Sequence, residues 1–487
     1  MDVNQLIKDL FALMPALILM GGAIFFLIIQ FFFHSNDHRI IRYLTGLILI
    51  ASHYYLCKIY YVSPGPGTFF KGQIAVNEIT YWLNSIYIIT ALFTIIASPR
   101  ILNQHEIFFP EFYPLILLAV SGMYFMTSGA DLIVIFVGLE LLSISLYILI
   151  GMARKELFSL EATMKYFLLG AFSAGFMLMG IAFLFGGSGS TLLVKALPQN
   201  LLDPINSSPL SETSIYSNIG FGLLLVGVGF KIALVPFHSW TPDVYEGSLT
   251  TITGFMASGA KSAAMGLLLV LFSYSTAIDT NSKWNILLGI IAIVSMTFGN
   301  IVALKQENLK RVLAYSSISH AGYVVAGIVC GAKLEVLYYL IIYSLMNIAG
   351  FVIIAYLENG KHHVTYSSLK YLVSKKPWSA IGLLIIFFSL GGIPPLGGFW
   401  TKLFLFQKIA ESENTLNRVL LIFGVVNSAI AIFYYLKVTV VAFMTEDKGE
   451  VTSSESIPFS FGLSFASAIS ILFVMFSWII FQPSNLR

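Results

Sequence analysis

The sequence of 487 residues contains little charge and almost no cysteine. Only 10% of its residues are charged, against about 25% in an ordinary soluble domain, and 57% are hydrophobic. The two cysteines, Cys57 and Cys330, stand far apart, so neither a disulfide framework nor a cysteine-rich metal or iron–sulfur site can be built. No strand–GxGxxG–helix unit of a dinucleotide-binding fold occurs either. These absences exclude a soluble redox domain.

Long apolar runs recur along the chain instead. A hydrocarbon core about 30 Å thick needs roughly 20 apolar residues of helix, and only helices or closed barrels satisfy their backbone there. The runs are unbroken rather than alternating, which excludes a barrel. We therefore predict an all-α polytopic membrane protein with about fourteen transmembrane helices. Their predicted spans lie near 12–33, 41–62, 79–98, 113–128, 131–152, 161–186, 217–240, 250–274, 285–303, 311–331, 335–357, 378–410, 415–445 and 458–482.

The loops between these spans carry charge unequally. With the N-terminus outside, one set of alternate loops holds most of the basic residues, among them Arg39, Arg154, Lys310 and Lys375. Loops rich in lysine and arginine stay on the cytoplasmic side. Both chain termini are therefore predicted to be periplasmic.

Two segments, 222–240 and 382–400, share an initial glycine, an apolar run, a late proline and a closing tryptophan. Each predicts an interrupted helix, the seventh and the twelfth. Because these lie an odd number of helices apart, a five-helix unit repeated in tandem must be inverted the second time. We expect an N-terminal three-helix segment (1–112), a first repeat with helices 4–8 (113–274), a second with helices 9–13 (285–445) and a C-terminal helix (446–487).

Two ionisable residues of the first repeat are expected to lie deep in the membrane. A charge at bilayer depth costs at least about 2.5–3.5 kcal/mol, so it needs a partner, water or a function. Glu140 lies about nine residues, or roughly 13 Å, into its span. Lys231 lies deep in the seventh helix, before Pro236. We predict that they form an ion pair whose separation switches the proton affinity of the lysine; the alternative is a purely structural Glu140.

Further basic residues are also predicted to lie inside the membrane and to take part in the relay. Lys261 stands in a run of small residues that leaves room for close packing and water. Lys402 follows the Gly391–Gly398 break, where irregular backbone must line protein or water. His238, seven residues after Lys231, can pass a proton between lysines, although a structural histidine is the alternative.

Lys165 is shallow enough that its ammonium could simply reach the surface, so proton uptake or tuning of Glu140 competes with that reading. Lys437, Tyr315 and His320 are interpreted as structural. Buried lysines, a glutamate and a histidine spread over several helices indicate a proton relay rather than a catalytic site with nucleophile, base and oxyanion hole. No metal site is expected.

Residues 235–247, Val-Pro-Phe-His-Ser-Trp-Thr-Pro-Asp-Val-Tyr-Glu-Gly, resemble the hallmark of the antiporter-like subunits of bacterial respiratory NADH:quinone oxidoreductase (complex I), of the subunit N type. Stretches 138–141, 161–166, 306–317 and 391–402 resemble the same family, so the likeness covers nearly the whole chain. One departure is Ser248-Leu249-Thr250-Thr251, where the family usually has Ala-Pro-Thr-Pro. The eighth helix is therefore expected to start or bend differently.

The resemblance implies a mechanism. Quinone reduction elsewhere in the complex would shift the Glu140–Lys231 pair, and a proton would pass through His238 and Lys261 to Lys402 and then to the periplasm. It also implies that NADH, FMN, iron–sulfur clusters and quinone belong to partner subunits, with no cofactor in this chain. The implied partners are neighbouring antiporter-like and small membrane subunits in the bacterial inner membrane, and no nucleic acid.

Two other classes remain open at this point. Multisubunit cation/proton antiporters and membrane-bound hydrogenases share broken helices and buried lysines, so a subunit of such a complex is the chief alternative. A purely structural spacer would need every buried charge to be satisfied internally and inert, which is costly for six such residues.

Overall fold

The structure is a computed structural model that describes residues 3–32, 39–62, 64–107, 109–197, 212–274, 283–358, 363–411 and 414–444. Its chain packs into two units. Unit 1 is built from Met1–Ile232 and Gly259–Ser282, and unit 2 from Ala233–Ser258 and Lys283–Arg487. Two of the three points at which the chain passes from one unit to the other, 232/233 and 258/259, fall inside the predicted first repeat. The repeat boundaries themselves remain a prediction, and the predicted helix 458–482 and segment 446–487 lie outside the described residues.

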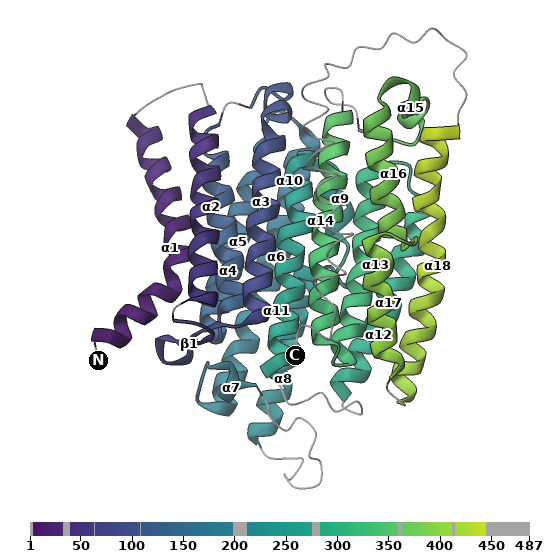
Figure 1. Cartoon of the computed structure of the whole chain (residues 1–487). Coiled ribbons are helices and arrows are strands. Elements are labelled where there is room, and N and C mark those ends of the chain that lie inside the picture. Colours follow the sequence, from purple (N-terminus) through teal and green to yellow (C-terminus); the bar gives the residue numbers. More distant parts are fainter. Residues whose placement is uncertain are drawn as a thin grey trace. The chain divides into compact units, whose positions relative to one another are not determined.

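Unit 1 contains most of the N-terminal helices and a small β-hairpin (Figure 1). Its elements are α1 (Val3–Phe32), α2 (Arg39–Tyr61), β1 (Gly67–Phe69), η1 (Phe70–Gly72), β2 (Ile74–Val76), α3 (Glu78–Gln104), α4 (Phe112–Ser128), α5 (Leu132–Ile150), α6 (Leu157–Ser188), α7 (Leu193–Ala196), α8 (Glu212–Ile232) and α11 (Lys261–Tyr274).

The named elements of unit 2 among its described residues are all helices. Its elements are α9 (Trp240–Gly247), α10 (Thr250–Phe255), α12 (Lys283–Ala303), α13 (Leu309–Val329), α14 (Lys333–Leu357), η3 (Ser367–Leu369), α15 (Leu372–Lys375), α16 (Pro377–Gly391), α17 (Gly397–Ala410) and α18 (Thr415–Met444). A π-helical segment, η2 (Met256–Ala260), joins α10 to α11 and carries the chain from unit 2 into unit 1.

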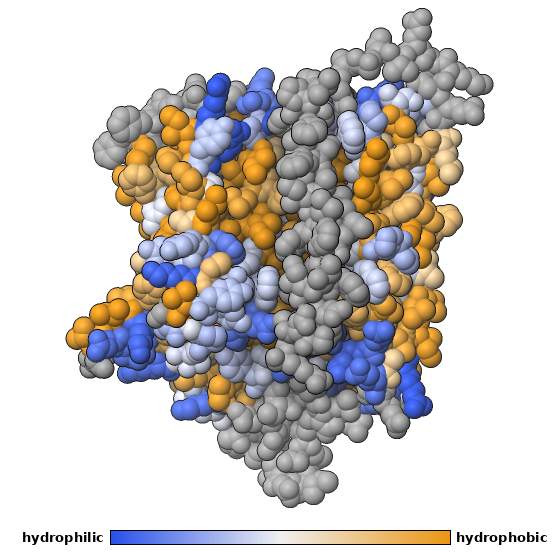
Figure 2. Space-filling model, viewed as in Figure 1, coloured by the Kyte–Doolittle hydropathy of each residue, from blue (hydrophilic) through white to orange (hydrophobic). Residues whose placement is uncertain are grey.

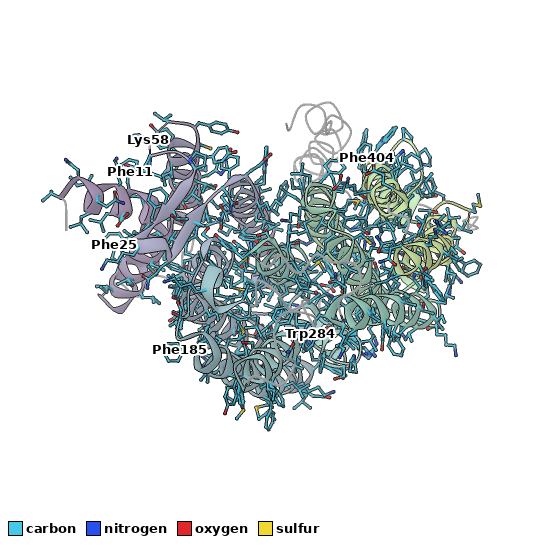
Figure 3. All side chains as sticks on the ribbon, turned by 90° about the horizontal axis from the view of Figure 1, so that it is seen from below. Phe11, Phe25, Lys58, Phe185, Trp284 and Phe404 are labelled. Atoms are coloured by element: carbon cyan, nitrogen blue, oxygen red, sulfur yellow. The ribbon has the colours of Figure 1, made fainter. Side chains whose placement is uncertain are left out.

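Eleven helices of the described residues are long and apolar enough to cross a membrane, and α4 and α16 are shorter apolar helices. On unit 1 the space-filling view shows mainly hydrophobic residues between the two ends, where hydrophilic residues gather (Figure 2). Large apolar side chains point outward from its helices, among them Phe25 and Phe185, which are 57% and 51% exposed (Figure 3). This exposure suits a lipid surrounding, and the fold is that of a polytopic membrane protein.

The first helix begins earlier than predicted. The expected start near residue 12 is wrong, because α1 already begins at Val3. Its first turns mix apolar residues with Asn4, Gln5, Lys8 and Asp9, and Gln5 Nε2 donates a hydrogen bond of 2.9 Å to Asp9 Oδ1 one turn later. A search for an unbroken apolar run missed these turns because polar residues interrupt them.

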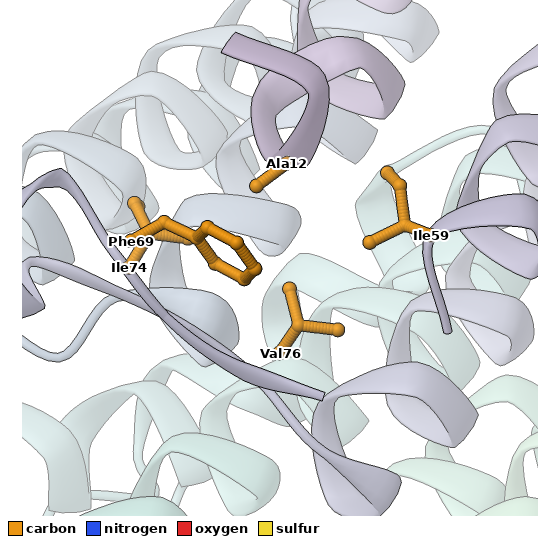
Figure 4. Packing of buried hydrophobic residues seen from close by; sticks show 5 residues of the cluster. All are labelled: Ala12, Ile59, Phe69, Ile74 and Val76. Atoms are coloured by element: carbon orange, nitrogen blue, oxygen red, sulfur yellow. The ribbon is translucent and has the colours of Figure 1, made fainter. Parts of the chain in front are cut away.

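The hairpin β1–β2 closes one end of the N-terminal helices. Phe69, Ile74 and Val76 pack against Ala12 of α1 and Ile59 of α2 in a buried cluster (Figure 4). Antiparallel pairing runs from Gly67 with Val76 to Phe69 with Ile74. The hairpin therefore has its own apolar anchor.

The same end of unit 1 is bound together by backbone hydrogen bonds between distant segments. Ala130 N donates to Gln73 O at 2.7 Å, and Leu132 N donates to Thr191 O at 2.9 Å. The Asp131 carboxylate caps α5 by accepting from Ile133 N at 2.8 Å and also accepts from Thr191 Oγ1 at 2.6 Å. The first turn of α5 is thus fixed to the segment that follows α6.

Both predicted helix interruptions are present. The seventh span breaks between α8 and α9, and the twelfth between α16 and α17. Each break contains a cis X-Pro bond, Val235–Pro236 in the first and Pro394–Pro395 in the second. In the first break Val235 N donates to Ser295 Oγ at 3.0 Å, so a backbone donor released by the break finds a side-chain partner.

Candidate functional site

Glu140 is the ninth residue of α5, as predicted. Close contact with α4 fixes the position of this helix, since a Cβ on Gly138 would lie 2.7 Å from Met126 N. The Glu140 side chain is half-buried, and its Oε1 atom is buried without a hydrogen-bond partner among the described residues. A buried acceptor without a partner is usually satisfied by a ligand, by water or by a group from outside the chain.

Lys231 lies in the last turn of α8 and is 8% exposed. Its Nζ donates a hydrogen bond of 2.7 Å to Ser143 Oγ on α5. The ring centroids of Tyr147 and Tyr166 lie 5.7 Å and 5.3 Å from the same nitrogen. One hydroxyl and two aromatic faces therefore hold this ammonium inside unit 1.

The predicted direct ion pair between Glu140 and Lys231 is not formed in this structure. No oxygen of Glu140 lies within 4.0 Å of Lys231 Nζ, although the two groups interact electrostatically. The reason is the position of Ser143, which stands three residues beyond Glu140 on α5 and receives the ammonium instead. About one helical turn separates the two candidate partners of Lys231.

Lys261 is the first residue of α11 and is 2% exposed. The π-helical segment Met256–Ala260 directly precedes it. Such segments widen a helix and frequently mark functional sites. The predicted close packing is confirmed at Gly259, where a Cβ would lie 2.8 Å from Thr90 Oγ1 of α3. This π-helical segment lies within the predicted eighth helix, and the expectation that this helix starts or bends differently from the family stays a prediction.

Lys165 has the most exposed side chain of the predicted relay residues. It lies in α6, which begins at Leu157 rather than near residue 161. Its side chain is 39% exposed, and its Nζ forms an ion pair of 2.7 Å with Glu161 Oε1 one turn earlier. This geometry agrees with the alternative of an ammonium that reaches the surface.

In unit 2, Lys402 is 5% exposed on α17. Its Nζ donates to Leu390 O at 3.1 Å and to Gly391 O at 3.2 Å. These carbonyls are released where α16 ends, as the prediction for the break required. No carboxylate of the described residues lies within ion-pairing distance of this ammonium.

Glycines shape the second break around Lys402. Gly392 adopts a left-handed φ of +84°, and a Cβ there would lie 3.1 Å from Lys402 Cδ. A Cβ on Gly398 would collide with Ser389 O, while Gly398 N donates to Ser389 Oγ at 3.0 Å. The two arms of the interrupted helix can approach this closely only because these side chains are absent.

His238 lies in the first break, between α8 and α9. Its ring packs edge-on against Phe298 with the centroids 4.5 Å apart. His238 belongs to unit 2 whereas Lys231 belongs to unit 1. Helix α8 ends at Ile232, so Lys231 and His238 do not lie on one continuous helix.

His320, interpreted as structural from the sequence, has a tyrosine hydroxyl at each of its ring nitrogens. It is 3% exposed on α13, and its Nδ1 lies 2.6 Å from Tyr339 OH while its Nε2 lies 3.1 Å from Tyr435 OH. Tyr435 OH also contacts Ser316 Oγ. A histidine with a hydroxyl at each ring nitrogen has its hydrogen-bonding groups satisfied and is chemically able to exchange a proton with them. The two tyrosines come from distant helices, so no local sequence pattern indicates it.

The other two residues interpreted as structural also have ring contacts. Lys437 Nζ lies 4.3 Å from the ring centroid of Tyr366, and the ring centroid of Tyr315 lies 6.4 Å from that of Phe298. Among the described residues no group of His, Cys, Asp and Glu could hold a metal ion.

The structure brings together Glu140, Ser143 and Lys231 in unit 1. In unit 2 it places Lys402 at the second break and His320 between two tyrosines.

The fold and these sites define a polytopic membrane protein with discontinuous helices and buried basic groups of the antiporter-like class. Residues 129–431 match the family described as NADH:quinone oxidoreductase/Mrp antiporter, TM. A NADH-quinone oxidoreductase subunit N of Leptospira interrogans is 52% identical over 486 residues, covering 99% of this chain and 92% of the relative. A subunit N of Roseiflexus castenholzii is 36% identical and covers 89% of this chain and 87% of the relative.

Solved structures agree. A chain of respiratory complex I from Thermus thermophilus with bound aureothin matches with a TM-score of 0.79 and 29% identity, covering 96% of this chain and 98% of that one. The Mrp complex of Dietzia sp. matches with a TM-score of 0.80 but 16% identity, over 98% and 96% of the two chains, so it shows the fold alone. The chain belongs to the NADH:quinone oxidoreductase/Mrp antiporter transmembrane family, among the subunit N proteins.

Proposed function

We propose that this chain is a proton-translocating membrane-arm subunit of an NADH:quinone oxidoreductase, driven by redox chemistry in other subunits. The observation that carries the proposal is a pair of buried lysines, Lys231 and Lys402, one beside each helix break. A buried ammonium whose surroundings change can bind and release a proton. Moving one charge against 100 mV requires about 2.3 kcal/mol, close to a change of about two pKa units at 1.36 kcal/mol each.

The proposed cycle begins in unit 1. A shift of α5 relative to α8 would exchange Ser143 for Glu140 as the partner of Lys231, which changes how firmly that lysine holds its proton. The proton then passes through His238 and Lys261 to Lys402 and leaves to the periplasm. Lys165 supplies protons to Glu140 or tunes it, and His320 joins the relay in unit 2.

The proposal also covers the cofactors of partner subunits, the neighbouring subunits and the orientation of the chain in the membrane. NADH, FMN, iron–sulfur clusters and quinone belong to partner subunits, and the partners are neighbouring antiporter-like and small membrane subunits in the bacterial inner membrane. Both termini are periplasmic. The fourteen helices comprise the three-helix segment 1–112, the inverted repeats 113–274 and 285–445, and the C-terminal helix 446–487.

The half-buried Glu140 supports contact with a neighbouring subunit. The exposed apolar residues Val137 and Ile144, 56% and 53% exposed, flank it on α5. A helix of a neighbouring subunit that covers this stripe would bury Glu140 further and supply a partner for its free oxygen. Such contact would also transmit a mechanical shift to α5.

The first experiment is Lys231→Ala in membranes that contain the assembled complex. We expect NADH-driven proton pumping and NADH:quinone turnover to fall together, because a pump without its carrier stops the coupled reaction. Assembly is checked on a native gel, and Lys408→Ala is the matched control, since Lys408 is exposed and paired with Glu411 at 2.7 Å. Unchanged pumping in assembled Lys231→Ala complexes would refute the proposal.

The same membranes test the alternative of a cation/proton antiporter. That function predicts Na⁺-dependent proton movement without NADH. Its absence, together with pumping that needs NADH, excludes the alternative.

A further inference from the structure

Unit 2 contains a buried pair of opposite charge that the proposed relay does not use. Lys310, at the start of α13, is 3% exposed, and Glu358, directly after α14, is 5% exposed. Lys310 Nζ lies 3.9 Å from Glu358 Oε1. Desolvation of two charges is costly, and a buried pair at this separation is weak support for stability. Its presence therefore calls for another explanation.

Neutral groups from the segment after α9 complete the pair. Lys310 Nζ donates to Ser248 O at 2.9 Å. The Thr250 hydroxyl lies 2.6 Å from each oxygen of the Glu358 carboxylate. Both residues belong to the Ser248–Thr251 stretch in which the chain departs from the family pattern. The carboxylate can accept a proton, and the adjacent Thr250 hydroxyl can pass one on. A proton-exchanging group needs both properties.

A neighbouring ionic cluster has a simpler role. Arg311 donates to Asp243 Oδ1 at 3.0 Å and to Glu246 Oε2 at 2.7 Å, and these side chains are about a quarter to a third exposed. Asn308 Nδ2 donates to Glu246 Oε1 at 2.9 Å. This cluster fastens α9 to the start of α13. The Lys310–Glu358 pair is therefore not needed for that attachment.

Polar groups lead from the region of the pair toward Lys402. Ser317, seven residues after Lys310 on α13, is buried, and its hydroxyl donates to Ala314 O at 2.6 Å. The ring of Tyr343 lies 5.0 Å from that of His320. Tyr323 follows, with its ring 5.9 Å from His320 and 5.6 Å from Lys402 Nζ.

Several hydroxyls along this line are buried without a hydrogen bond of ordinary geometry to any described residue: those of Thr251, Ser319, Tyr323 and Tyr343. Buried polar groups of this kind recruit ordered water. Water between such hydroxyls can conduct a proton where side chains do not touch directly. The line from Glu358 to Lys402 stays within unit 2.

We infer that Lys310 and Glu358 form a proton-loading pair that supplies Lys402 from the cytoplasmic side. The inference rests on the proposed function and on the predicted sidedness, which places this end of α13 inside. A proton from the cytoplasm binds the Glu358 carboxylate and forms an O–H bond, which releases the ion pair while Lys310 keeps its charge. The proton then moves along the hydroxyl line and binds neutral Lys402, which has already released its own proton outward. Glu358 returns to its carboxylate form.

The test compares Glu358→Gln, Glu358→Asp and the double variant Lys310→Met/Glu358→Gln in assembled complexes, with Glu411→Gln as the exposed control. We expect Glu358→Gln to lower NADH-driven pumping at least about tenfold, a conservative bound when a positioned acid–base group supplies about 10²–10⁴ in proton-transfer rate. Glu358→Asp should keep most of the pumping, and the double variant should stay as slow as Glu358→Gln. A structural ion pair predicts the reverse, since neutralising both partners restores it. Recovery in the double variant, or an aspartate variant as slow as the glutamine one, would overturn the inference.

Two further measurements complete the design. If Glu358→Gln does not assemble, Thr250→Val replaces it, because it removes the adjacent hydroxyl and leaves both charges; unchanged pumping there overturns the inference. Lys402→Ala is measured in parallel. If Lys402→Ala pumps normally, the proposed function fails; if it stops pumping while Glu358→Gln does not, only the loading pair fails.

Discussion

The two helix breaks hold their lysines in different ways. At the first, Lys231 is bound by a hydroxyl and two aromatic rings of other helices and is electrostatically coupled to Glu140. At the second, Lys402 is bound by two carbonyls of its own interrupted helix, and no described carboxylate lies within ion-pairing distance. Lys231 can therefore exchange one partner for another when α5 and α8 move. Lys402 keeps its two carbonyl partners unless the backbone of its own helix break changes.

The largest effect is expected from closing the second break. Gly398→Ala places a methyl group against the carbonyl of Ser389, a backbone atom that cannot move aside. Overpacking of this kind costs about 1–3 kcal/mol and more when backbone is involved. We expect little assembled complex on a native gel. Gly175→Ala on α6, where nothing lies within 4 Å of the added carbon, is the matched control and should assemble normally.

The next effect concerns the acid of the first site. Glu140→Gln removes the charge that couples to Lys231 and leaves the shape intact. Losing one charged partner at a desolvated site costs about 2–5 kcal/mol, which predicts a fall in pumping of at least roughly tenfold. Pumping and NADH:quinone turnover are measured together, with Glu140→Asp expected to retain activity. Normal pumping in Glu140→Gln would mean that Lys231 does not need a switchable partner.

A smaller effect is expected from the alternative partner of Lys231. Ser143→Ala removes the hydroxyl that receives the ammonium at 2.7 Å. A hydrogen bond to a charged group contributes about 1.5–3 kcal/mol, part of which water or Glu140 can replace. We expect pumping to fall several-fold and Ser143→Thr to behave as the parent. Identical rates in Ser143→Ala and the parent would show that the observed contact has no part in the cycle.

The smallest effect is expected at Lys165. Its exposed ion pair with Glu161 belongs to a class that contributes about 0–1 kcal/mol. Because about 1 kcal/mol corresponds to a factor of about five, Lys165→Ala should lower pumping by less than about fivefold. A loss of pumping as large as that of Glu140→Gln would contradict this expectation and show that Lys165 is an essential residue of the relay.

The sequence predicts most of the helices and both breaks, because apolar length and the Pro/Gly clusters act locally. Glu140 appears at its predicted depth for the same reason. The partner of Lys231 could not be predicted, since a difference of one helical turn between Glu140 and Ser143 depends on how α8 is set against α5. The early start of α1 was missed because polar residues interrupt the apolar residues of its first turns.

The residues around His320 were missed for a related reason. Its two tyrosine partners lie 19 and 115 residues away, on α14 and α18, and a single sequence carries no pattern that links them. The buried pair of Lys310 and Glu358 is also a product of tertiary packing. Lysine and glutamate at helix ends are ordinary surface residues when only the sequence is considered.

The hydrogen bonds around Asp131 give α5 a fixed end. Asp131 caps the helix, and Thr191 and Gln73 hold the adjoining backbone. Glu140 lies about 13 Å from this anchored turn, at 1.5 Å per residue. A tilt of roughly 5° about it would displace Glu140 by about 1 Å and the far end of the helix by about twice as much. The far end of α5 is held as well, because Ser159 Oγ donates a hydrogen bond of 2.7 Å to Ile150 O. Both ends of the helix that carries Glu140 are therefore fastened to other segments of unit 1, and only a small displacement of Glu140 is compatible with these hydrogen bonds.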